Sequence, residues 1–361
     1  MFENRVYNFS AGPSMLPESV LKQVQSELLN YGQSGMSILE MSHRSKTYQE
    51  VFDATEAALR RVMRVPDNYK ILFLQGGASL QFAAIPLNLM KTGKADYIVT
   101  GNFAKKAAAE AKKYGDVHIA ATGEAENFTR IPRQNELDLR SDADYVHICF
   151  NNTIYGTHWD YIPDTGDVPL VADMSSCILS EEIDVSRFGV IYAGAQKNIA
   201  PAGLTIVIIR EDLAGNARAD IPVVMDYATE IKNASMYNTP PTFPIYVCKL
   251  VVEWVESIGG VKALEQINHR KAAALYDFLD QSKLFHNTIS PESRSYMNVT
   301  FKTDSDECNA AFVAQAAADG LLTLKGHRAV GGMRASIYNA MPEEGVRKLI
   351  AFMDAFEKKN G

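Results

Sequence analysis

One lysine stands in a run of small and uncharged residues that could hold an amine away from water. Residues 193–203 read AGAQKNIAPAG, with Lys197 at the centre and an apolar stretch before them. Burial disfavours the charged form of a lysine and lowers its pKa, and a neutral amine can form a Schiff base near neutral pH. Lys197 is therefore a candidate for covalent catalysis, and the alternative is an ordinary surface lysine in a loop.

A single aspartate ends another short apolar stretch. Asp173 follows residues 170–172 and is followed by Met-Ser-Ser. An acid at the C-terminal end of a strand faces the crevice where α/β sheets bind ligands. Pyridoxal phosphate requires such an acid, because a carboxylate keeps the pyridine nitrogen protonated and lets the ring accept electrons. Alone, Asp173 could equally be a helix N-cap, but Asp173 together with Lys197 predicts this cofactor and its two catalytic residues.

A glycine-rich turn offers a place for a phosphate group. Residues 75–79 read QGGAS and lie between an expected strand and an expected helix. Backbone N–H groups in such a turn, with the helix N-terminus, can bind a phosphate. The segment lacks the spacing of a P-loop or of a dinucleotide-binding motif. One phosphate at this turn is what pyridoxal phosphate would need, whereas a plain strand-to-helix turn is the alternative.

Two clusters of basic side chains lie outside the expected sheet. His43 and Arg44 form one cluster, and His327, Arg328 and Arg334 form the other within a glycine-rich segment. Arginine binds carboxylates and phosphates through paired hydrogen bonds. The clusters favour an anionic substrate, and solvated arginines on a surface hairpin are the alternative. The seven histidines show no spacing typical of a metal site, so we expect no metal.

The composition is that of a globular protein with no electrostatic reason to bind nucleic acid or a membrane. Of 361 residues, 47% are hydrophobic and 22% charged, and the formal net charge is −7. Nucleic acids and anionic membranes attract basic surfaces instead. Residues 1–16 lack a signal-peptide pattern and no apolar run approaches the ~20 residues that span a bilayer, so we expect a cytoplasmic protein. The four cysteines form no C-x-x-C pair, which favours buried free thiols.

Short β-rich runs between residues 69 and 210 predict the sheet that would position these residues. Their continuous apolar character is typical of strands covered on both faces, and the helical segments between them suit crossover connections. We expect an α/β protein with a mostly parallel sheet of about seven strands, flanked by helices. The expected strands are residues 71–74, 96–99, 117–120, 145–149, 170–172, 190–193 and 204–209.

Helical patterns occur both between the expected strands and outside them. Residues 80–90 and 103–114 predict two helices within the sheet region. Outside it, Pro17 and Pro342 each precede a helical pattern with one apolar face, and the first of these helices is expected to end at Gly32.

The pattern changes after residue 259 to long helical stretches with a few strands, such as residues 297–301. We expect a large cofactor-binding domain of residues 16–259. A smaller α+β C-terminal domain would combine residues 1–15 and 260–361.

These segments together resemble the phosphoserine aminotransferases over essentially the whole chain. That family consists of homodimeric pyridoxal-phosphate enzymes of fold type I, the aspartate aminotransferase-like fold, with active sites at the subunit interface. The segments that carry the resemblance are Asn8–Pro13, Ser42–Ser45, Gly194–Asn198, Asn238–Phe243, Gly326–Arg328 and Ser336–Ala340.

The resemblance implies a set of cofactor contacts. Lys197 would form the Schiff base and Asp173 would pair with the pyridine nitrogen. Phe103 stands where the family usually has a tryptophan, so ring stacking would persist without an indole N–H, which bears on the strength of cofactor binding. The remaining implied contacts are Thr153 and Gln196 to the cofactor, Ala78 and Ser79 to its phosphate, and Asn238 and Thr239 to the phosphate of the other subunit.

The resemblance also implies how substrates are held. Arg334 would bind the α-carboxylate, and Ser10 would lie beside the substrate. The distal phosphate or carboxylate would be bound, partly across the dimer, by His43, Arg44, His327 and Arg328.

The implied reaction transfers an amino group between O-phospho-L-serine and 2-oxoglutarate and gives 3-phosphooxypyruvate and L-glutamate, a step of serine biosynthesis. Related members also act on 4-phosphohydroxy-L-threonine in pyridoxine biosynthesis. Lys197 would shuttle the proton at the substrate Cα.

Two alternatives remain open at this point. Another branch of the fold, such as a cysteine desulfurase or an alanine–glyoxylate aminotransferase, is one of them. A desulfurase needs a mobile nucleophilic cysteine, whereas the thiols here lie mostly in apolar stretches. A non-catalytic binding protein is the other, although it would have no chemical need for both Lys197 and Asp173.

Overall fold

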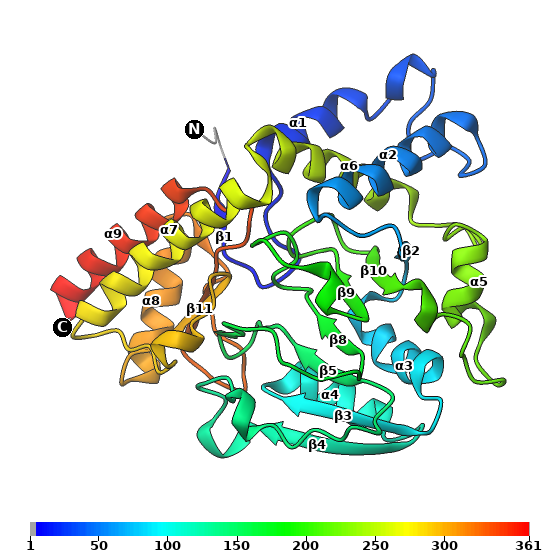
Figure 1. The fold of residues 1–361 in the computed structure, drawn as a ribbon. Helices are drawn as coiled ribbons and strands as arrows, with labels where there is room; N and C mark the ends of the chain where they lie inside the picture. The colour runs from blue at the N-terminus through cyan, green and yellow to red at the C-terminus, as the bar shows by residue number, and fades with distance from the viewer. Residues whose placement is uncertain (1–4, 361) are drawn as a thin grey trace.

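A seven-stranded sheet forms the centre of the computed structural model, which describes residues 5–360 (Figure 1). The strand order is β2-β10-β9-β8-β5-β3-β4. β10 runs antiparallel to both of its neighbours, and the other pairings in the sheet are parallel. The strands are β2 (Tyr69–Leu74), β3 (Lys94–Val99), β4 (Asp116–Thr122), β5 (Val146–Cys149), β8 (Leu170–Asp173), β9 (Val190–Gly194) and β10 (Thr205–Arg210). The prediction of about seven strands in a mostly parallel sheet is confirmed.

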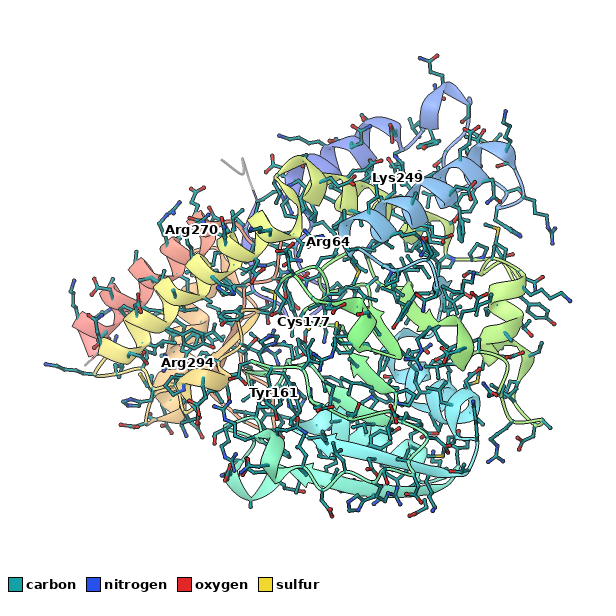
Figure 2. All side chains as sticks on the ribbon, in the orientation of Figure 1. Arg64, Tyr161, Cys177, Lys249, Arg270 and Arg294 are labelled. Atoms are coloured by element: carbon teal, nitrogen blue, oxygen red, sulfur yellow. The ribbon has the colours of Figure 1, made fainter. Side chains whose placement is uncertain are left out.

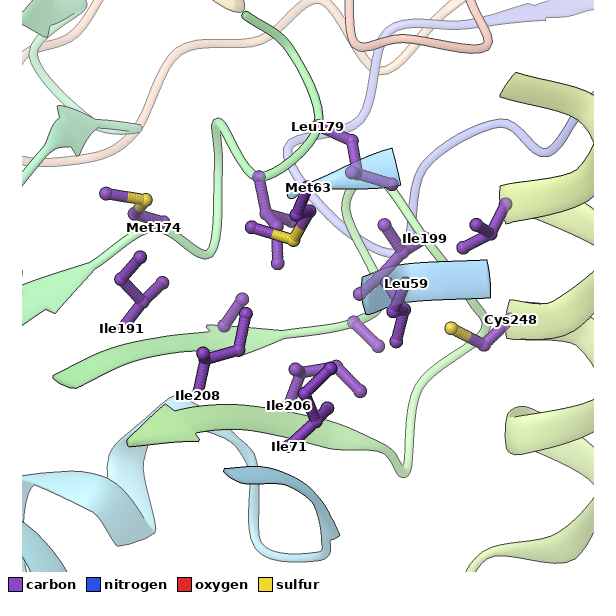
Figure 3. Close-up of a cluster of buried hydrophobic side chains, with 14 of the residues drawn as sticks. Leu59, Met63, Ile71, Met174, Leu179, Ile191, Ile199, Ile206, Ile208 and Cys248 are labelled. Atoms are coloured by element: carbon purple, nitrogen blue, oxygen red, sulfur yellow. The ribbon is translucent and has the colours of Figure 1, made fainter. Parts of the chain in front are cut away.

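Helices cover both faces of this sheet. α2 (Lys46–Val62) and α6 (Thr242–Ser257) share one hydrophobic cluster with the sheet, and α3 (Gly77–Leu89) and α4 (Asn102–Ala111) share another on the opposite face. Figure 3 shows Ile191, Ile206 and Ile208 of the strands in the first cluster, with Cys248 of α6. Successive residues of a strand point to opposite faces, which is why apolar residues occur at successive positions along most of these strands.

A second layer of helices and short strands follows the sheet in the chain and lies beside it in Figure 1. α7 (Gly260–Gln281), α8 (Asp306–Ala318) and α9 (Glu343–Asn360) share a hydrophobic cluster with the antiparallel pair β11 (Asn298–Phe301) and β13 (Met333–Ser336). β1 (Tyr7–Asn8) pairs with β12 (Leu321–Leu322), so the N-terminal segment joins this cluster.

The remaining elements are short. They comprise α1 (Glu18–Glu27), α5 (Tyr227–Lys232) and the antiparallel pair β6 (Asn151–Asn152) and β7 (Thr157–His158). Turns of 3-10 helix lie at Tyr31–Gln33, Glu124–Glu126, Gln134–Glu136, Val185–Arg187, Glu211–Leu213, Val223–Met225 and Pro291–Ser293. Within residues 5–360, no helix combines the length and hydropathy that crossing a bilayer requires.

Three predicted helices differ from the structure at an end. α4 ends at Ala111 rather than at residue 114. α1 ends at Glu27, and the predicted end, Gly32, lies in a separate 3-10 turn that follows an extended Asn30 with φ −151°. Leu29, between the two, is 86% exposed. α3 begins at Gly77 rather than at residue 80, which places Ala78 and Ser79 inside its first turn.

Candidate active site

Lys197 lies in the turn that follows β9, at the edge of the sheet. Its Nζ donates a hydrogen bond to Thr153 Oγ1 at 2.7 Å and lies 5.4 Å from the centroid of the Phe103 ring. The turn closes through N–H groups of Ile199 and Ala200, both of which donate to the Ala195 carbonyl. The half-buried lysine is therefore held between a hydroxyl group and an aromatic ring.

Glycine residues allow other segments to approach this turn closely. A Cβ added at Gly194 would lie 3.0 Å from Gln196 Oε1 and 3.6 Å from the Ala78 nitrogen, so the lysine turn is adjacent to the start of α3. The N-terminal segment passes on another side, where a Cβ at Gly12 would lie 3.4 Å from Lys197 Cγ.

Two serines belong to that N-terminal segment. The Ser14 N–H donates to the Gln196 carbonyl at 3.0 Å, and its hydroxyl donates to the Lys197 carbonyl. Ser10, a predicted substrate contact, accepts a hydrogen bond from the Gly12 N–H at 3.3 Å.

Asp173 lies at the C-terminal end of β8, next to β9 in the sheet, and is 5% exposed. Its Oδ1 accepts the Ser175 N–H at 2.9 Å, and the Ser175 hydroxyl accepts the Gly194 N–H at 3.0 Å. Burial raises the pKa of Asp173, whereas the Lys197 charge and hydrogen bonds from Ser175 and Tyr192 lower it. The parallel strands thus bring Asp173 and Lys197 to one edge, as their places in the sequence predicted.

This carboxylate lacks a close cation. Among residues 5–360, none forms an ion pair with Asp173 within 4.0 Å. An ionised carboxylate is costly to bury unless a charged or hydrogen-bonding partner compensates for it. A protonated pyridine nitrogen would be such a partner, so the residues present fit pyridoxal phosphate.

The start of α3 is suited to a phosphate group. Gly76 and Gly77 have φ values of 91° and 66°, and a Cβ at Gly76 would lie 2.7 Å from the Leu80 Cβ, so glycine is required there. The first N–H groups of a helix have no intrahelical acceptor, and no side chain caps this one. The N–H groups of Ala78 and Ser79 are therefore placed to bind an anion.

A cavity of about 210 Å³ adjoins this turn and is lined in part by Gln75, Gly76 and Asn238. Asn238 Nδ2 donates to Gln75 Oε1 at 3.0 Å and to the Thr239 carbonyl at 3.3 Å. Within the single chain, Asn238 and Thr239 thus lie next to the segment that leads into α3.

Arg334 lies on β13, the strand that packs with α7, α8 and α9, and its side chain extends to the residues around Lys197. Its Nη1 donates to the Thr153 carbonyl at 3.3 Å, while its Nε is buried and has no hydrogen-bond partner among the described residues. Burial lowers the pKa of Arg334. Burial and the charges of Arg334, Arg328 and Lys106 likewise lower the pKa of His327. Four basic groups therefore gather beside Lys197.

His43 and Arg44 lie elsewhere, in the loop that precedes α2. In the described part of the chain, no hydrogen bond or ion pair joins either side chain to the Lys197 group. Of the predicted site residues, these two are not brought together with the others within one chain.

Comparison with known proteins identifies the family. The model of the class-V aminotransferases matches residues 6–349. A phosphoserine aminotransferase from Bacillus cereus is 58% identical over 357 residues, which cover 99% of each protein. The chain belongs to the class-V aminotransferase family.

Solved structures of this branch match closely. A phosphoserine aminotransferase from Bacillus circulans subsp. alkalophilus matches with a TM-score of 0.98 at 46% identity, covering 99% of this chain and 100% of the other. A phosphoserine aminotransferase from Trichomonas vaginalis with bound PLP matches with a TM-score of 0.93 at 40% identity, covering 97% and 100%. The aminotransferase therefore has the fold type I architecture that the resemblance implied.

The cysteines of this aminotransferase are free and offer no mobile nucleophile. Cys149, Cys177 and Cys248 are buried and Cys308 is partly buried. Figure 2 shows Cys177 at the centre of the molecule among packed side chains. Burial raises the pKa of the Cys149 and Cys177 thiols, which keeps both protonated. This arrangement disfavours the desulfurase alternative.

Residue-by-residue reasoning missed Tyr192, His147 and Lys106. Tyr192 and His147 carry polar atoms within apolar strands, and that contrast was the signal that they lie in the polar layer behind Asp173. Lys106 is exposed on α4, with its Nζ 5.7 Å from the Phe103 centroid, and its charge helps to lower the pKa of His327.

Proposed function

We propose that this aminotransferase uses pyridoxal phosphate to transfer the amino group between O-phospho-L-serine and 2-oxoglutarate, giving 3-phosphooxypyruvate and L-glutamate. The relatives named phosphoserine aminotransferase support the substrate pair. The observation that carries the proposal is the gathering of Arg334, Arg328 and His327 beside a buried Asp173 and Lys197. Such a set can bind a substrate with two anionic ends next to a reactive amine.

Pyridoxal phosphate, when bound to a lysine, supplies an electron sink for the electrons released at the substrate Cα. Lys197 Nζ would hold it covalently, and the Asp173 carboxylate would pair with the protonated ring nitrogen. The Phe103 ring would stack on one face. Further contacts would come from Thr153, Gln196, Ala78 and Ser79.

Lys197 moves the proton in this proposal. Nζ, beside the Thr153 hydroxyl, would take the proton from Cα of the amino donor and pass it to the cofactor. With 2-oxoglutarate as acceptor, Nζ would move a proton in the opposite direction, from the cofactor to the corresponding carbon. The half-buried position limits the access of water to this amine.

Both substrates can use the same basic groups. Phosphoserine and 2-oxoglutarate each have an α-carboxylate and a second anionic group farther along the molecule. Arg334, with its unpartnered Nε, would bind the α-carboxylate. Arg328 and His327, with Ser10 nearby, would bind the distal group.

A homodimer is part of the proposal. His43 and Arg44 would reach the substrate of the partner subunit, and Asn238 and Thr239 would complete its phosphate site. Exposed apolar side chains in nearby segments support a surface that a second copy covers: Leu28, Leu29, Met36, Leu39, Val223, Val224 and Tyr237.

We also propose the domain division of residues 16–259 against residues 1–15 with 260–361. The second hydrophobic cluster supports it, because Phe9 and Met15 pack there with residues of α7, α8 and α9. A cytoplasmic location and a role in pyridoxine biosynthesis stay predictions.

The direct test is to incubate the purified protein with phosphoserine and 2-oxoglutarate and to measure glutamate. Unphosphorylated serine and alanine serve as control amino donors. We expect glutamate to form much faster from phosphoserine, because only this donor has a distal phosphate. If alanine gave glutamate as fast as phosphoserine, the proposed preference for phosphoserine would be wrong, although the protein would still be an aminotransferase.

A further inference from the structure

Asp173 is backed by a buried chain of polar side chains that extends away from Lys197. Tyr192 on β9 is the register partner of Asp173 on β8, so both side chains lie on the same face of the sheet, and hydrogen bonding by the Tyr192 hydroxyl lowers the pKa of the Asp173 carboxyl. His147 on β5 continues the chain, with Nε2 2.8 Å from Tyr192 Oη. Tyr192 is 0% exposed and His147 2% exposed, so neither can exchange these bonds for water.

The hydrogen bonds of this chain can run in one direction only. A tyrosine hydroxyl has a single hydrogen, and an ionised carboxylate can only accept. If Tyr192 donates to Asp173, its oxygen must accept from His147, and the proton of His147 then lies on Nε2. Nδ1 keeps a bare lone pair, in agreement with the absence of a partner for this atom among residues 5–360.

The neighbouring strand holds the imidazole ring in place. Tyr97 on β3 is the register partner of His147, and the two rings stack with centroids 4.7 Å apart and an interplanar angle of 21°. Burial lowers the pKa of His147 to about 3, so the ring is neutral near neutral pH. The Tyr97 hydroxyl bonds instead to Tyr145 at 2.7 Å and stays outside the chain.

We propose that Tyr192 and His147 are positioning residues that keep Asp173 ionised and aimed at the ring nitrogen of pyridoxal phosphate. Hydrogen bonds to the charged form of a carboxyl make it a weaker base. The proton shared between Asp173 and the ring nitrogen then stays on the nitrogen. His147, by donating to Tyr192, polarises the hydroxyl and fixes its direction. The inference rests on the proposed role of Asp173.

The test compares Tyr192→Phe with Tyr97→Phe. Both changes remove one buried hydroxyl from the same layer of the sheet, but only the first removes a donor to Asp173. With pyridoxal phosphate labelled with ¹⁵N at the ring, the nitrogen shift reports protonation. We expect a protonated nitrogen in wild type and Tyr97→Phe, and a shift toward the neutral nitrogen in Tyr192→Phe.

The kinetic readout separates positioning from substrate binding. Tyr192→Phe should lower kcat for phosphoserine by about tenfold, the effect of one charge-assisted hydrogen bond, with KM little changed. Tyr97→Phe, the control variant, should have the kcat of wild type. An unchanged nitrogen shift in Tyr192→Phe, or the same change in both variants, would overturn the inference.

A second measurement is made on the wild-type protein and uses a variant only to assign the signal. NMR of the imidazole nitrogens in the wild-type holoenzyme, assigned with His147→Gln, should show His147 neutral with its proton on Nε2. A proton on Nδ1 would contradict the proposed direction of the hydrogen bonds, and this test holds even if the phenylalanine variants fail to fold. If wild type binds no pyridoxal phosphate, the proposed function fails instead, and the His147 tautomer still tests the hydrogen-bond direction.

Discussion

Replacing Arg334 by lysine separates recognition of the α-carboxylate from recognition of the distal phosphate. The substitution keeps a positive charge at a half-buried position but removes the planar fork that can bind a carboxylate through two hydrogen bonds. In the structure, Nη1 already bonds to the Thr153 carbonyl, and the buried Nε has no partner within residues 5–360. Lysine can satisfy the carbonyl or the substrate, but not both in the same geometry.

The expected loss of kcat/KM follows from the hydrogen bonds that lysine cannot replace. A hydrogen bond to a charged group contributes about 1.5–3 kcal/mol, which corresponds to roughly ten- to a hundredfold in kcat/KM. Every amino donor has an α-carboxylate, so phosphoserine and alanine should lose by the same factor. Retention of the charge should keep the stability close to that of wild type.

The assay measures kcat/KM for phosphoserine and for alanine at fixed 2-oxoglutarate, with the cofactor absorption as a check that the site remains intact. Arg328→Leu is the matched comparison, because this exposed arginine lies six residues earlier in the same segment. A loss confined to phosphoserine in Arg334→Lys, or no loss with either donor, would refute the assignment of Arg334 to the α-carboxylate.

Three further outcomes are expected. Arg328→Leu should lower kcat/KM for phosphoserine by roughly ten- to a hundredfold and barely change the rate with alanine; an equal loss for both donors would remove Arg328 from the phosphate site. Lys197→Ala should almost abolish transamination, and borohydride treatment followed by mass spectrometry should find no cofactor attached; near-normal turnover would contradict its role. Asp173→Asn should fold, as judged by circular dichroism, yet lose most of its kcat because an amide cannot pair with a cationic nitrogen; an unchanged kcat would mean that another acid faces the ring.

Local sequence determined the sheet and the two residues at its edge. Continuous apolar runs identified all seven strands, because a strand buried on both faces needs apolar residues at successive positions. Lys197 and Asp173 each follow such a run, and the C-terminal ends of parallel strands meet at one edge. Helix ends followed less directly from the sequence. α1 ends before the predicted Gly32, because the dihedral angles of a few residues decide where a helix ends.

The basic clusters in the sequence indicated an anionic substrate, and the resemblance assigned a role to each residue. His43 and Arg44 show why residue types and spacing are insufficient to identify a substrate site. They form the same His-Arg pair as His327 and Arg328, but within residues 5–360 no hydrogen bond or ion pair joins their side chains to the Lys197 group. In the proposed homodimer, they would meet the substrate of the second copy.

Tertiary structure alone decided which distant residues touch. Arg334 reaches the Thr153 carbonyl across 181 positions, and the N-terminal Ser14 reaches the Lys197 carbonyl across 183. The chain from Asp173 through Tyr192 to His147 depends on strand order and register, since one residue of slip would turn each side chain to the other face of the sheet. Local propensity sets where strands form, but the packing of whole layers sets which strands are neighbours, and the surroundings of the Asp173 carboxylate follow from that packing.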